Sequence, residues 1–447
     1  MSMNRTILYT RLNSSQTPRK SLILRIVLPL VAVSFVLFCA VGYLSSQPTY
    51  HVYGRHSNQH SPITQQYVNQ SQLMEQLRSL YDCKSVDDSY RIEQRGNFWV
   101  LKNFITPDRE QPLRCYETIT YTTHADYRFL ENIVPLLERW QAPISIAVYA
   151  PGEEFDLAIE ALRFHMFCHR QSYLMEEYAS VHLYFDFDRM PSKPIDYYRN
   201  LTFKPYNCPV NSEGSPEPDR TSNREYPVNV GRNIARDAAQ THFVLASDIE
   251  LYPNPGFIEM FQRMIANPVY RYTLQTPSVY VLPIFEVAET STVPEDKIEL
   301  LRMMKHGDAI KFHEKICEQC HTVPNYEEWK RVIKTDETMD ILVTAKRKGQ
   351  FEVWEPIYVG TKQDPLYDER LSWEGKFDKM TQGYIMCVLG YNFHVLDNGF
   401  LVHKPGMKTV SEASRPDLEN RQRKFIDTTI FAELKILFGE AHSCSIT

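Results

Sequence analysis

The stretch Phe243-Val-Leu-Ala-Ser-Asp-Ile-Glu-Leu-Tyr-Pro253 decides the fold class of this 447-residue chain. Its first residues are apolar and favour a short buried strand, and two acidic residues, Asp248 and Glu250, follow directly. Because these residues are two positions apart, both side chains project from one face of an extended backbone. Polar residues in this position are typical of the carboxyl edge of a parallel sheet, where α/β proteins bind ligands.

Strands and helices alternate before this stretch. Expected strands cover residues 117–123, 144–149, 181–185 and 242–246, and expected helices cover 127–140, 153–167 and 228–239. Pro135 predicts a kink or a new first turn in the first helix. The order predicts an α/β domain with a Rossmann-like, mainly parallel central sheet and flanking helices on both faces. We expect residues 206–226, which are polar and proline-rich, to form a surface excursion within this domain.

The acidic pair points to a divalent cation. Carboxylates such as Asp248 and Glu250 are hard oxygen ligands that suit Mn²⁺ or Mg²⁺. A cation at this edge can hold the two phosphates of a nucleotide-sugar and neutralise the diphosphate that leaves. Acidic residues after a strand are also ordinary in turns, so the pair alone leaves both interpretations open.

Other charged segments supply the remaining candidates. The expected helix 228–239 carries Arg232, Asn233 and Arg236 near an N-terminus, where diphosphate oxygens can bind, although a salt-bridged surface helix has the same composition. An apolar run ends in His403, whose imidazole can complete a metal site, and in Lys404, a cation for phosphate. A solitary histidine is more often structural. A segment rich in carboxylates, cations and aromatic rings contains Asp368, Glu369, Arg370, Trp373, Glu374 and Asp378.

The N-terminal residues predict a membrane anchor. Residues 26–44 are nineteen uncharged residues, close to the ~20 that cross a bilayer as a helix. Five basic residues precede them and the first acidic residue is Glu75, so the N-terminus is expected in the cytosol. We expect a cytosolic tail over 1–21, a type II anchor over 22–44, a stem over 45–80 and a luminal domain over 81–440. A cleaved signal peptide and a buried core helix are the alternatives.

Charge and composition exclude several classes. The chain is 43% hydrophobic and 23% charged, which excludes collagen-like, coiled-coil and wholly disordered proteins. Its net charge is -6, and since the first 44 residues carry five positive charges, the remainder is near -11. A body this acidic is a poor binder of nucleic acid. No GxSxG or HExxH motif supports a serine hydrolase or zinc protease.

The cysteines and sequons fit an oxidising lumen. Eight of the nine cysteines lie after the expected anchor, where pairing is permitted but the partners cannot be derived. The sequence Cys317-Glu-Gln-Cys320-His321 matches the haem-attachment string and half a zinc site, but without further ligands a disulfide or buried thiols are expected. Asn69 and Asn200 stand in glycosylation sequons on the luminal side.

Taken in order, the anchor, the stem, the RNxAR helix, the DIELYP strand, PLYDERLSWEGKFDKM at 365–380 and GFLVHKPG at 399–406 resemble glycosyltransferase family 49. The resemblance covers residues 110–415. It implies a GT-A fold, a Golgi membrane location and inverting, manganese-dependent transfer from UDP-glucuronic acid to a glycan. A xylose-terminated acceptor of protein O-mannosyl glycan synthesis is expected.

Carried onto this chain, the resemblance assigns roles to residues. The metal ligands are Asp248, Glu250 and His403. From their charge and position, Arg232 and Lys404 are expected to add positive charge at the diphosphate. The sugar site is made by Asp368, Glu369, Arg370 and the stretch to Lys379. Within that stretch, Glu374 or Asp378 is the expected base that deprotonates the acceptor hydroxyl, although both are also ordinary charges of a solvated loop.

Two departures from the family pattern leave other functions open. Glu250 stands where the family has Asp, and residues 373–379 contain one additional residue, with Asp378 in the place of Asn. One alternative keeps the fold and uses UDP-N-acetylglucosamine or UDP-xylose. The other is a non-catalytic, glycan-binding partner that stabilises another Golgi transferase.

Overall fold

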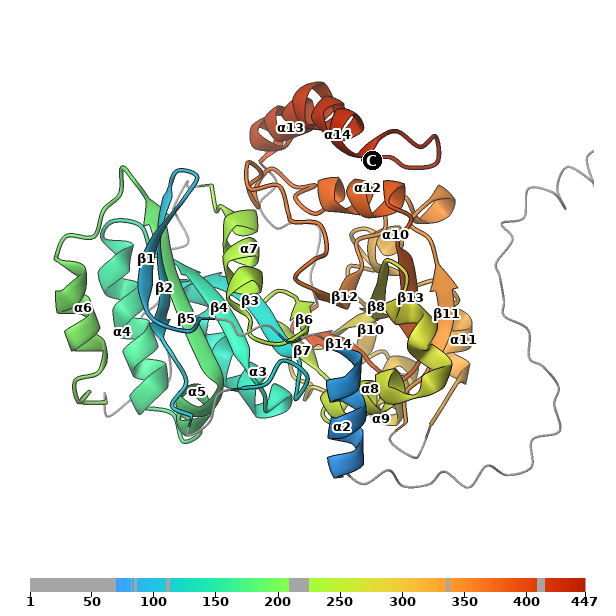
Figure 1. Cartoon of the computed structure of the whole chain (residues 1–447), viewed down its shortest axis with the longest axis horizontal. Coiled ribbons are helices and arrows are strands. Elements are labelled where there is room, and N and C mark those ends of the chain that lie inside the picture. Colours follow the sequence, from blue (N-terminus) through green and yellow to red (C-terminus); the bar gives the residue numbers. More distant parts are fainter. Residues whose placement is uncertain are drawn as a thin grey trace, which may run out of the picture. The chain divides into compact units, whose positions relative to one another are not determined.

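The computed structural model describes residues 70–81, 83, 87–109, 113–208, 225–334, 338–407 and 415–446, which all belong to a compact unit over His56–Thr447 (Figure 1). The expected tail and anchor, residues 1–44, lie outside the described residues, as do Asn69 and most of the excursion 206–226. No described helix has the length and apolar character needed to span a membrane.

Part of the expected stem is folded. Residues Gln70–Leu80 form helix α2, which packs against helix α8 (Phe257–Ala266). Its Leu73 and Leu77 are buried in the main hydrophobic core, which explains why this stretch is ordered despite its polar composition. The compact domain therefore begins before residue 81.

Ten of the described strands form the central sheet. In spatial order they are β1 (Arg91–Arg95), β2 (Phe98–Ile105), β5 (Ala179–Asp186), β4 (Ile144–Tyr149), β3 (Thr120–Asp126), β6 (Phe243–Ala246), β12 (Ile357–Thr361), β8 (Ser278–Leu282), β13 (Asn392–Leu396) and β11 (Ile341–Ala345). A smaller sheet contains β10 (Ala309–Lys311), β9 (Ile284–Val287), β14 (Leu401–His403) and β7 (Leu251–Pro253).

The central sheet is mixed. Strands β5, β4, β3 and β6 are parallel neighbours, as the alternating sequence predicts, and β13 is parallel to β8. The expectation of a mainly parallel sheet is correct for this inner part only. Strand β12 enters between β6 and β8 antiparallel to both, and β1, β2 and β11 add antiparallel edges. The sequence of a short strand does not indicate which strand lies beside it unless a crossover helix follows. The pairing of β12 was therefore not predictable.

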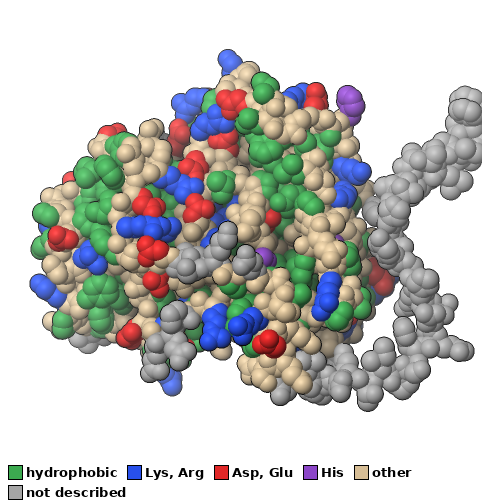
Figure 2. All heavy atoms as spheres, in the orientation of Figure 1, with side chains coloured by type: hydrophobic (Ala, Val, Ile, Leu, Met, Phe, Trp, Pro, Cys, Tyr) green, Lys and Arg blue, Asp and Glu red, His purple; other side chains and the backbone are tan. Residues whose placement is uncertain are grey.

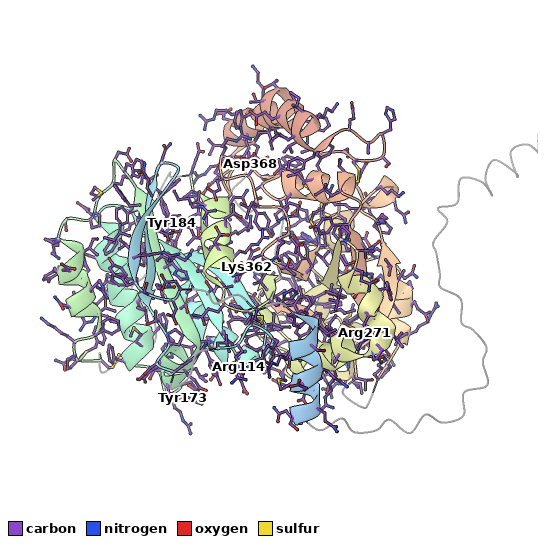
Figure 3. All side chains as sticks on the ribbon, viewed as in Figure 1. Arg114, Tyr173, Tyr184, Arg271, Lys362 and Asp368 are labelled. Atoms are coloured by element: carbon purple, nitrogen blue, oxygen red, sulfur yellow. A yellow bond between two sulfur atoms is a disulfide. The ribbon has the colours of Figure 1, made fainter. Side chains whose placement is uncertain are left out.

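Helices cover both faces of the parallel strands. Alternate residues of β4 enter different cores: Ile144, Ile146 and Val148 face the main core, whereas Ala147 and Tyr149 face helix α7 (Val228–Ala238). Helix α7 lies close to the sheet because Gly231 has no side chain; an added Cβ would lie 2.7 Å from the Tyr184 hydroxyl. Figure 3 shows Tyr184 on β5 beside this helix.

The remaining helices surround these sheets. Before α7 they are η1 (Tyr127–Asn132), α3 (Ile133–Trp140), α4 (Glu154–Phe167), α5 (Tyr173–Tyr178) and α6 (Ile195–Thr202). After α8 they are η2 (Pro268–Leu274), α9 (Lys297–His306), α10 (Glu318–His321), α11 (Tyr326–Arg331), η3 (Gly349–Phe351), α12 (Met380–Val388), α13 (Pro416–Phe425), η4 (Ile426–Ile430) and α14 (Phe431–Phe438). Pro135 lies in the first turn of α3, where the chain changes from a 3-10 turn to an α-helix, as predicted.

All eight cysteines after the expected anchor are paired. The disulfides are Cys83–Cys115, Cys168–Cys208, Cys317–Cys320 and Cys387–Cys444. The CxxCH sequence is therefore a disulfide, which was one of the two expected forms. Figure 2 shows acidic and basic side chains intermixed on this face of the molecule.

Candidate active site

The acidic loop, Ser247–Glu250, joins the two sheets. It follows β6 of the central sheet and leads directly into β7 of the smaller sheet. The buried Tyr121 hydroxyl donates to the carbonyl oxygens of Asp248 and Leu251, at 2.9 and 2.7 Å. These contacts fix the backbone of the loop at the carboxyl edge of the parallel strands, where the sequence predicts a site.

Glu250 and His403 form one half of this site. Strand β14 is antiparallel to β7 with His403 opposite Leu251, so its ring reaches the acidic loop. The His403 Nε2 atom lies 2.9 Å from Glu250 Oε1, and Nδ1 lies 2.8 Å from the carbonyl oxygen of Lys404. A carbonyl only accepts, so Nδ1 carries a proton, and at 2.9 Å a proton or a cation must lie between Nε2 and Glu250 Oε1.

Asp248 forms the other half and contacts basic groups. Its Oδ1 atom lies 3.2 Å from Arg232 and 3.2 Å from His124 Nε2, and Oδ2 lies 3.5 Å from Lys379. Although burial favours the neutral acid, the positive charge of Lys379, the hydrogen bond from His124 and the charge of Arg232 hold the pKa of Asp248 well below its usual range. Burial also lowers the pKa of His124, so its ring is neutral beside Arg232 and Lys379.

The donor set suits the expected cation. Two carboxylates and one imidazole are ligands for Mn²⁺ or Mg²⁺, and two donors of one octahedral ion are separated by about 3 Å, as Glu250 and His403 are. As they stand, no three acidic, histidine or cysteine side chains among the described residues converge on one point. Asp248 points to its basic neighbours, so a shared ion would need its carboxylate to turn toward Glu250.

Helix α7 positions the segment after β12. The Asn233 side chain donates to the carbonyl oxygen of Tyr367 at 2.9 Å and accepts from the N–H of Tyr367 at 3.1 Å. Arg236 donates to the carbonyl oxygens of Thr361, Asp364 and Pro365. Asn229 donates to the carbonyl oxygens of Asp368 and Asp378, both at 2.8 Å. Asn233 and Arg236 were expected to bind a diphosphate; here the Asn233 amide donates to the Tyr367 carbonyl and to the Glu369 carboxylate, and Arg236 donates to backbone carbonyls.

Arg232 is the residue of this helix that reaches the acidic loop. Its guanidinium is buried and makes a short ion pair with Asp378, contacts Asp248 at 3.2 Å and donates to Asn229 at 2.9 Å. The two carboxylates raise the pKa of Arg232 against the effect of burial. Arg232 thus links α7, the acidic loop and the segment that ends at Lys379.

The residues expected to bind the sugar are spread along that segment. Asp368 pairs with Arg370 at 2.7 Å, and Arg370 also pairs with Glu433 of α14 at 2.8 Å. Glu369 pairs with Arg95 at 2.7 Å, and the backbone N–H of the exposed Trp373 donates to the carbonyl oxygen of Tyr226. Figure 3 shows Asp368 on the segment above α7. Lys362, labelled below α7 in the same view, donates to the carbonyl oxygen of Ala239 at 2.7 Å.

Both carboxylates expected to act as the base have protein partners. The Asp378 side chain is buried against Arg232. Glu374 accepts a hydrogen bond from the Tyr226 backbone N–H at 2.8 Å, and burial raises the pKa of this carboxyl. Lys404, expected at the phosphates, pairs with the exposed Glu131 at 2.9 Å.

Sequence reasoning overlooked three residues of this region. His124 lies near the end of β3, and its pattern is that of a buried strand residue, so nothing marks it as a partner of Asp248. Lys379 ends the stretch that was expected to form the sugar site, but its contact with Asp248 was not anticipated. Glu355 precedes β12 and interacts with Lys379, Asp378 and Arg232. The isolated acid in Trp354-Glu355-Pro356 carries no spacing signal, and only the pairing of β12 with β6 brings it here.

Comparison with known proteins agrees with this geometry. A family model described as "Glycosyl-transferase for dystroglycan" matches residues 118–439. The chain is 28% identical over 364 residues to beta-1,4-glucuronyltransferase 1 of Danio rerio, covering 76% of this chain and 80% of the relative. For the protein of that name from Homo sapiens the identity is 26%, covering 81% and 84%.

A more distant relative is the xylosyl- and glucuronyltransferase LARGE1 of Homo sapiens. It is 22% identical over 398 residues, which cover 84% of this chain and 44% of that protein. The mixed sheet with flanking helices fits a GT-A-like fold. The chain belongs to the glycosyltransferase family described as "Glycosyl-transferase for dystroglycan", glycosyltransferase family 49, and is a glycosyltransferase that takes a sugar donor and a glycan acceptor.

Proposed function

We propose that the chain is a metal-dependent glucuronyltransferase that transfers glucuronic acid from UDP-glucuronic acid to a xylose-terminated glycan, with inversion at the anomeric carbon. The observation that carries this proposal is the convergence of Glu250 and His403 beside Asp248 at the carboxyl edge of β6. The names of the relatives support the choice of donor.

The proposed metal ligands are Asp248, Glu250 and His403. When bound, Mn²⁺ or Mg²⁺ would neutralise the diphosphate as it leaves. The exchange of Asp for Glu at position 250 keeps the carboxylate and lengthens its side chain by one methylene, and the 2.9 Å contact indicates that this longer arm reaches His403.

The cations of the site have distinct proposed roles. Lys379 and Arg232 balance the charge of Asp248, and both become available to phosphate oxygens when Asp248 turns toward the metal. Lys404 lies beside His403, and its exposed pair with Glu131 exchanges easily for a phosphate. Asn233 and Arg236 act by holding the backbone of residues 361–369 in place.

The sugar is proposed to bind along residues 368–379. Arg370 is a natural partner for the uronate carboxylate, since its pair with Asp368 is partly exposed, and Trp373 offers an exposed ring to the acceptor. Glu374 and Asp378, the carboxylates that the resemblance suggests as the base, lie in the same segment and are engaged by Tyr226 and Arg232.

The proposed cellular setting is the Golgi lumen. It rests on the predicted type II anchor over 22–44, with the catalytic domain on the luminal side. The four disulfides support this setting because such bonds persist in oxidising compartments. Association with other Golgi transferases is compatible with this location.

A donor panel tests the proposal. The detergent-solubilised full chain is incubated with a β-xyloside acceptor, Mn²⁺ and, separately, UDP-glucuronic acid, UDP-xylose and UDP-N-acetylglucosamine, and the product is identified by mass spectrometry. Product from UDP-glucuronic acid alone is expected. Product from another donor would reassign the specificity, and no product from any donor would favour a non-catalytic partner of another transferase.

A further inference from the structure

We propose that Glu355 is the catalytic base, the carboxylate that takes the proton of the acceptor hydroxyl. The proposal rests on the proposed transferase function and adds to it a residue outside the segments that the sequence pattern marked. Four features carry it: the position of Glu355 at the sheet edge, its rigid backbone, its unengaged carboxylate and its basic surroundings.

The strand register brings Glu355 to the acidic loop. Strand β12 runs antiparallel to β6, with Val359 opposite Leu245 and Thr361 opposite Phe243. Glu355 lies two residues before β12, and its carboxyl interacts with Lys379 and Arg232, the two cations that contact Asp248 in the acidic loop. Glu355 therefore enters the candidate active site from the neighbouring strand of the same sheet edge.

The backbone at Glu355 is held from two sides. Its N–H donates to the carbonyl oxygen of Cys320 at 2.8 Å, next to the Cys317–Cys320 disulfide. The preceding carbonyl, that of Trp354, accepts from Nε of the buried Arg347 at 2.8 Å. A base must keep its place within a fraction of an ångström, and these contacts supply that support. They also give the CxxC disulfide a role, since it holds helix α10, whose Cys320 carbonyl accepts the hydrogen bond from Glu355.

The carboxylate itself is unengaged. None of the described residues makes a hydrogen bond or close ion pair with it, in contrast to Asp378 and Glu374. The side chain lies deep in the protein yet retains partial solvent access, as expected on the floor of an open site. A buried acid without a hydrogen-bond partner is costly for folding, which favours a functional reason for its presence.

The charges around Glu355 suit a base. Burial raises the pKa of this carboxyl and the charge of Asp378 adds to the rise, while Lys379, Arg347 and Arg232 act in the opposite direction. A raised pKa strengthens the carboxylate as a proton acceptor. Lys379 also interacts with Asp248, so one cation connects the proposed base with the proposed metal ligand.

The proposed step is a single displacement. The acceptor O–H bond breaks and its proton moves to a Glu355 oxygen, while the acceptor oxygen forms a bond to the anomeric carbon. The bond from that carbon to the phosphate oxygen breaks, and its electron pair leaves with UDP. Glu355 then releases the proton to solvent through its accessible side, which restores the carboxylate for the next turnover.

The variant Glu355→Gln tests the assignment. It keeps the size of the side chain and removes its basicity, so transfer should fall by about 100-fold or more. Binding of UDP-glucuronic acid with Mn²⁺, measured by calorimetry on the full chain, should stay within about threefold, because the donor does not need the base. Glu355→Asp should retain part of the activity. Glu352→Gln, three residues earlier and bonded to Ser445 at 3.1 Å, is the matched control and should keep wild-type rates.

A second readout separates catalysis from structure. The rate of the wild-type chain should fall toward acid pH with an apparent pKa above that of an ordinary glutamate, and this acid limb should be absent from the residual activity of Glu355→Gln. Activity of Glu355→Gln within about threefold of wild type would overturn the proposal. Loss of transfer in Glu374→Gln or Asp378→Asn with intact donor binding, while Glu355→Gln stays active, would move the role to that residue.

The test also separates this inference from the proposed function. All rates are compared with the donor that the wild-type chain uses, so failure of glucuronic acid as the donor contradicts the proposed specificity and leaves the comparison of variants intact. A wild-type chain that turns over no donor would contradict both.

Discussion

Arg232 offers a direct test of how the site is held together. Its guanidinium is 5% exposed and lies between Asp378 and Asp248. Truncation in Arg232→Ala leaves Asp378 buried without its cation, while Asp248 keeps Lys379 at 3.5 Å and His124 at 3.2 Å. Removing one partner of a buried ion pair lowers the free energy of unfolding by about 3 to 5 kcal/mol. Because only one carboxylate is left without its cation, we expect a loss near the lower end of this range, about 3 kcal/mol.

Urea unfolding of the same preparations measures this loss. Arg263→Ala on α8 is the control, because its pair with Glu259 is exposed and should contribute less than about 0.5 kcal/mol. Adding Asp378→Asn to Arg232→Ala removes the stranded charge and should recover about 1 to 3 kcal/mol. An unfolding free energy of Arg232→Ala within about 1 kcal/mol of the wild-type value would contradict this prediction, as would the absence of any recovery when Asp378→Asn is added.

Three further predictions concern the metal, pH and the lumen. His403→Ala should weaken Mn²⁺ binding at least about tenfold in calorimetry, whereas the exposed His306→Ala should not. Burial and the charge of Lys102 lower the pKa of His182 to about 3, so the unfolded chain binds an extra proton at this residue below about pH 6.5. In urea titrations, the fall in unfolding free energy from pH 6.5 to 5 should therefore be smaller in His182→Gln than in the wild type by about 2 kcal/mol, while the other buried histidines keep their share. If the domain is luminal, Asn200, exposed on α6, should carry a glycan, and the endoglycosidase mobility shift should be smaller in Asn200→Gln than in the wild type. An unchanged wild-type band would contradict the proposed orientation.

The inner part of the fold was predictable because its signals are local. The expected strand 144–149 coincides with β4, and the expected helix 228–239 coincides with α7 to within one residue. Both have a clear hydrophobic period and a turn or proline at their ends. The antiparallel strand β12 depends on contacts between residues over 100 positions apart, which leave no periodic trace in the sequence.

The same contrast applies to the site. Asp248 and Glu250 stand together after a strand, so the sequence alone marks them. Their partners His124, Arg232 and Lys379 come from distant parts of the chain. Arg232 was named for its position on a helix, although its observed contacts are carboxylates. The structure also shows two uses of helix α7. Arg232 reaches the acidic loop, whereas Asn233 and Arg236 donate hydrogen bonds to the backbone of the segment after β12. No sequence pattern distinguishes these two uses of a polar helix face.

The most direct test of the central claim is the release of UDP from UDP-glucuronic acid by the purified full chain, with a xyloside acceptor, in Mn²⁺ and in EDTA. The account predicts release that depends on the metal and the acceptor and that is abolished in Asp248→Asn. Release that is unchanged in EDTA, or that persists at wild-type rate in Asp248→Asn, would contradict a metal site built on the acidic loop.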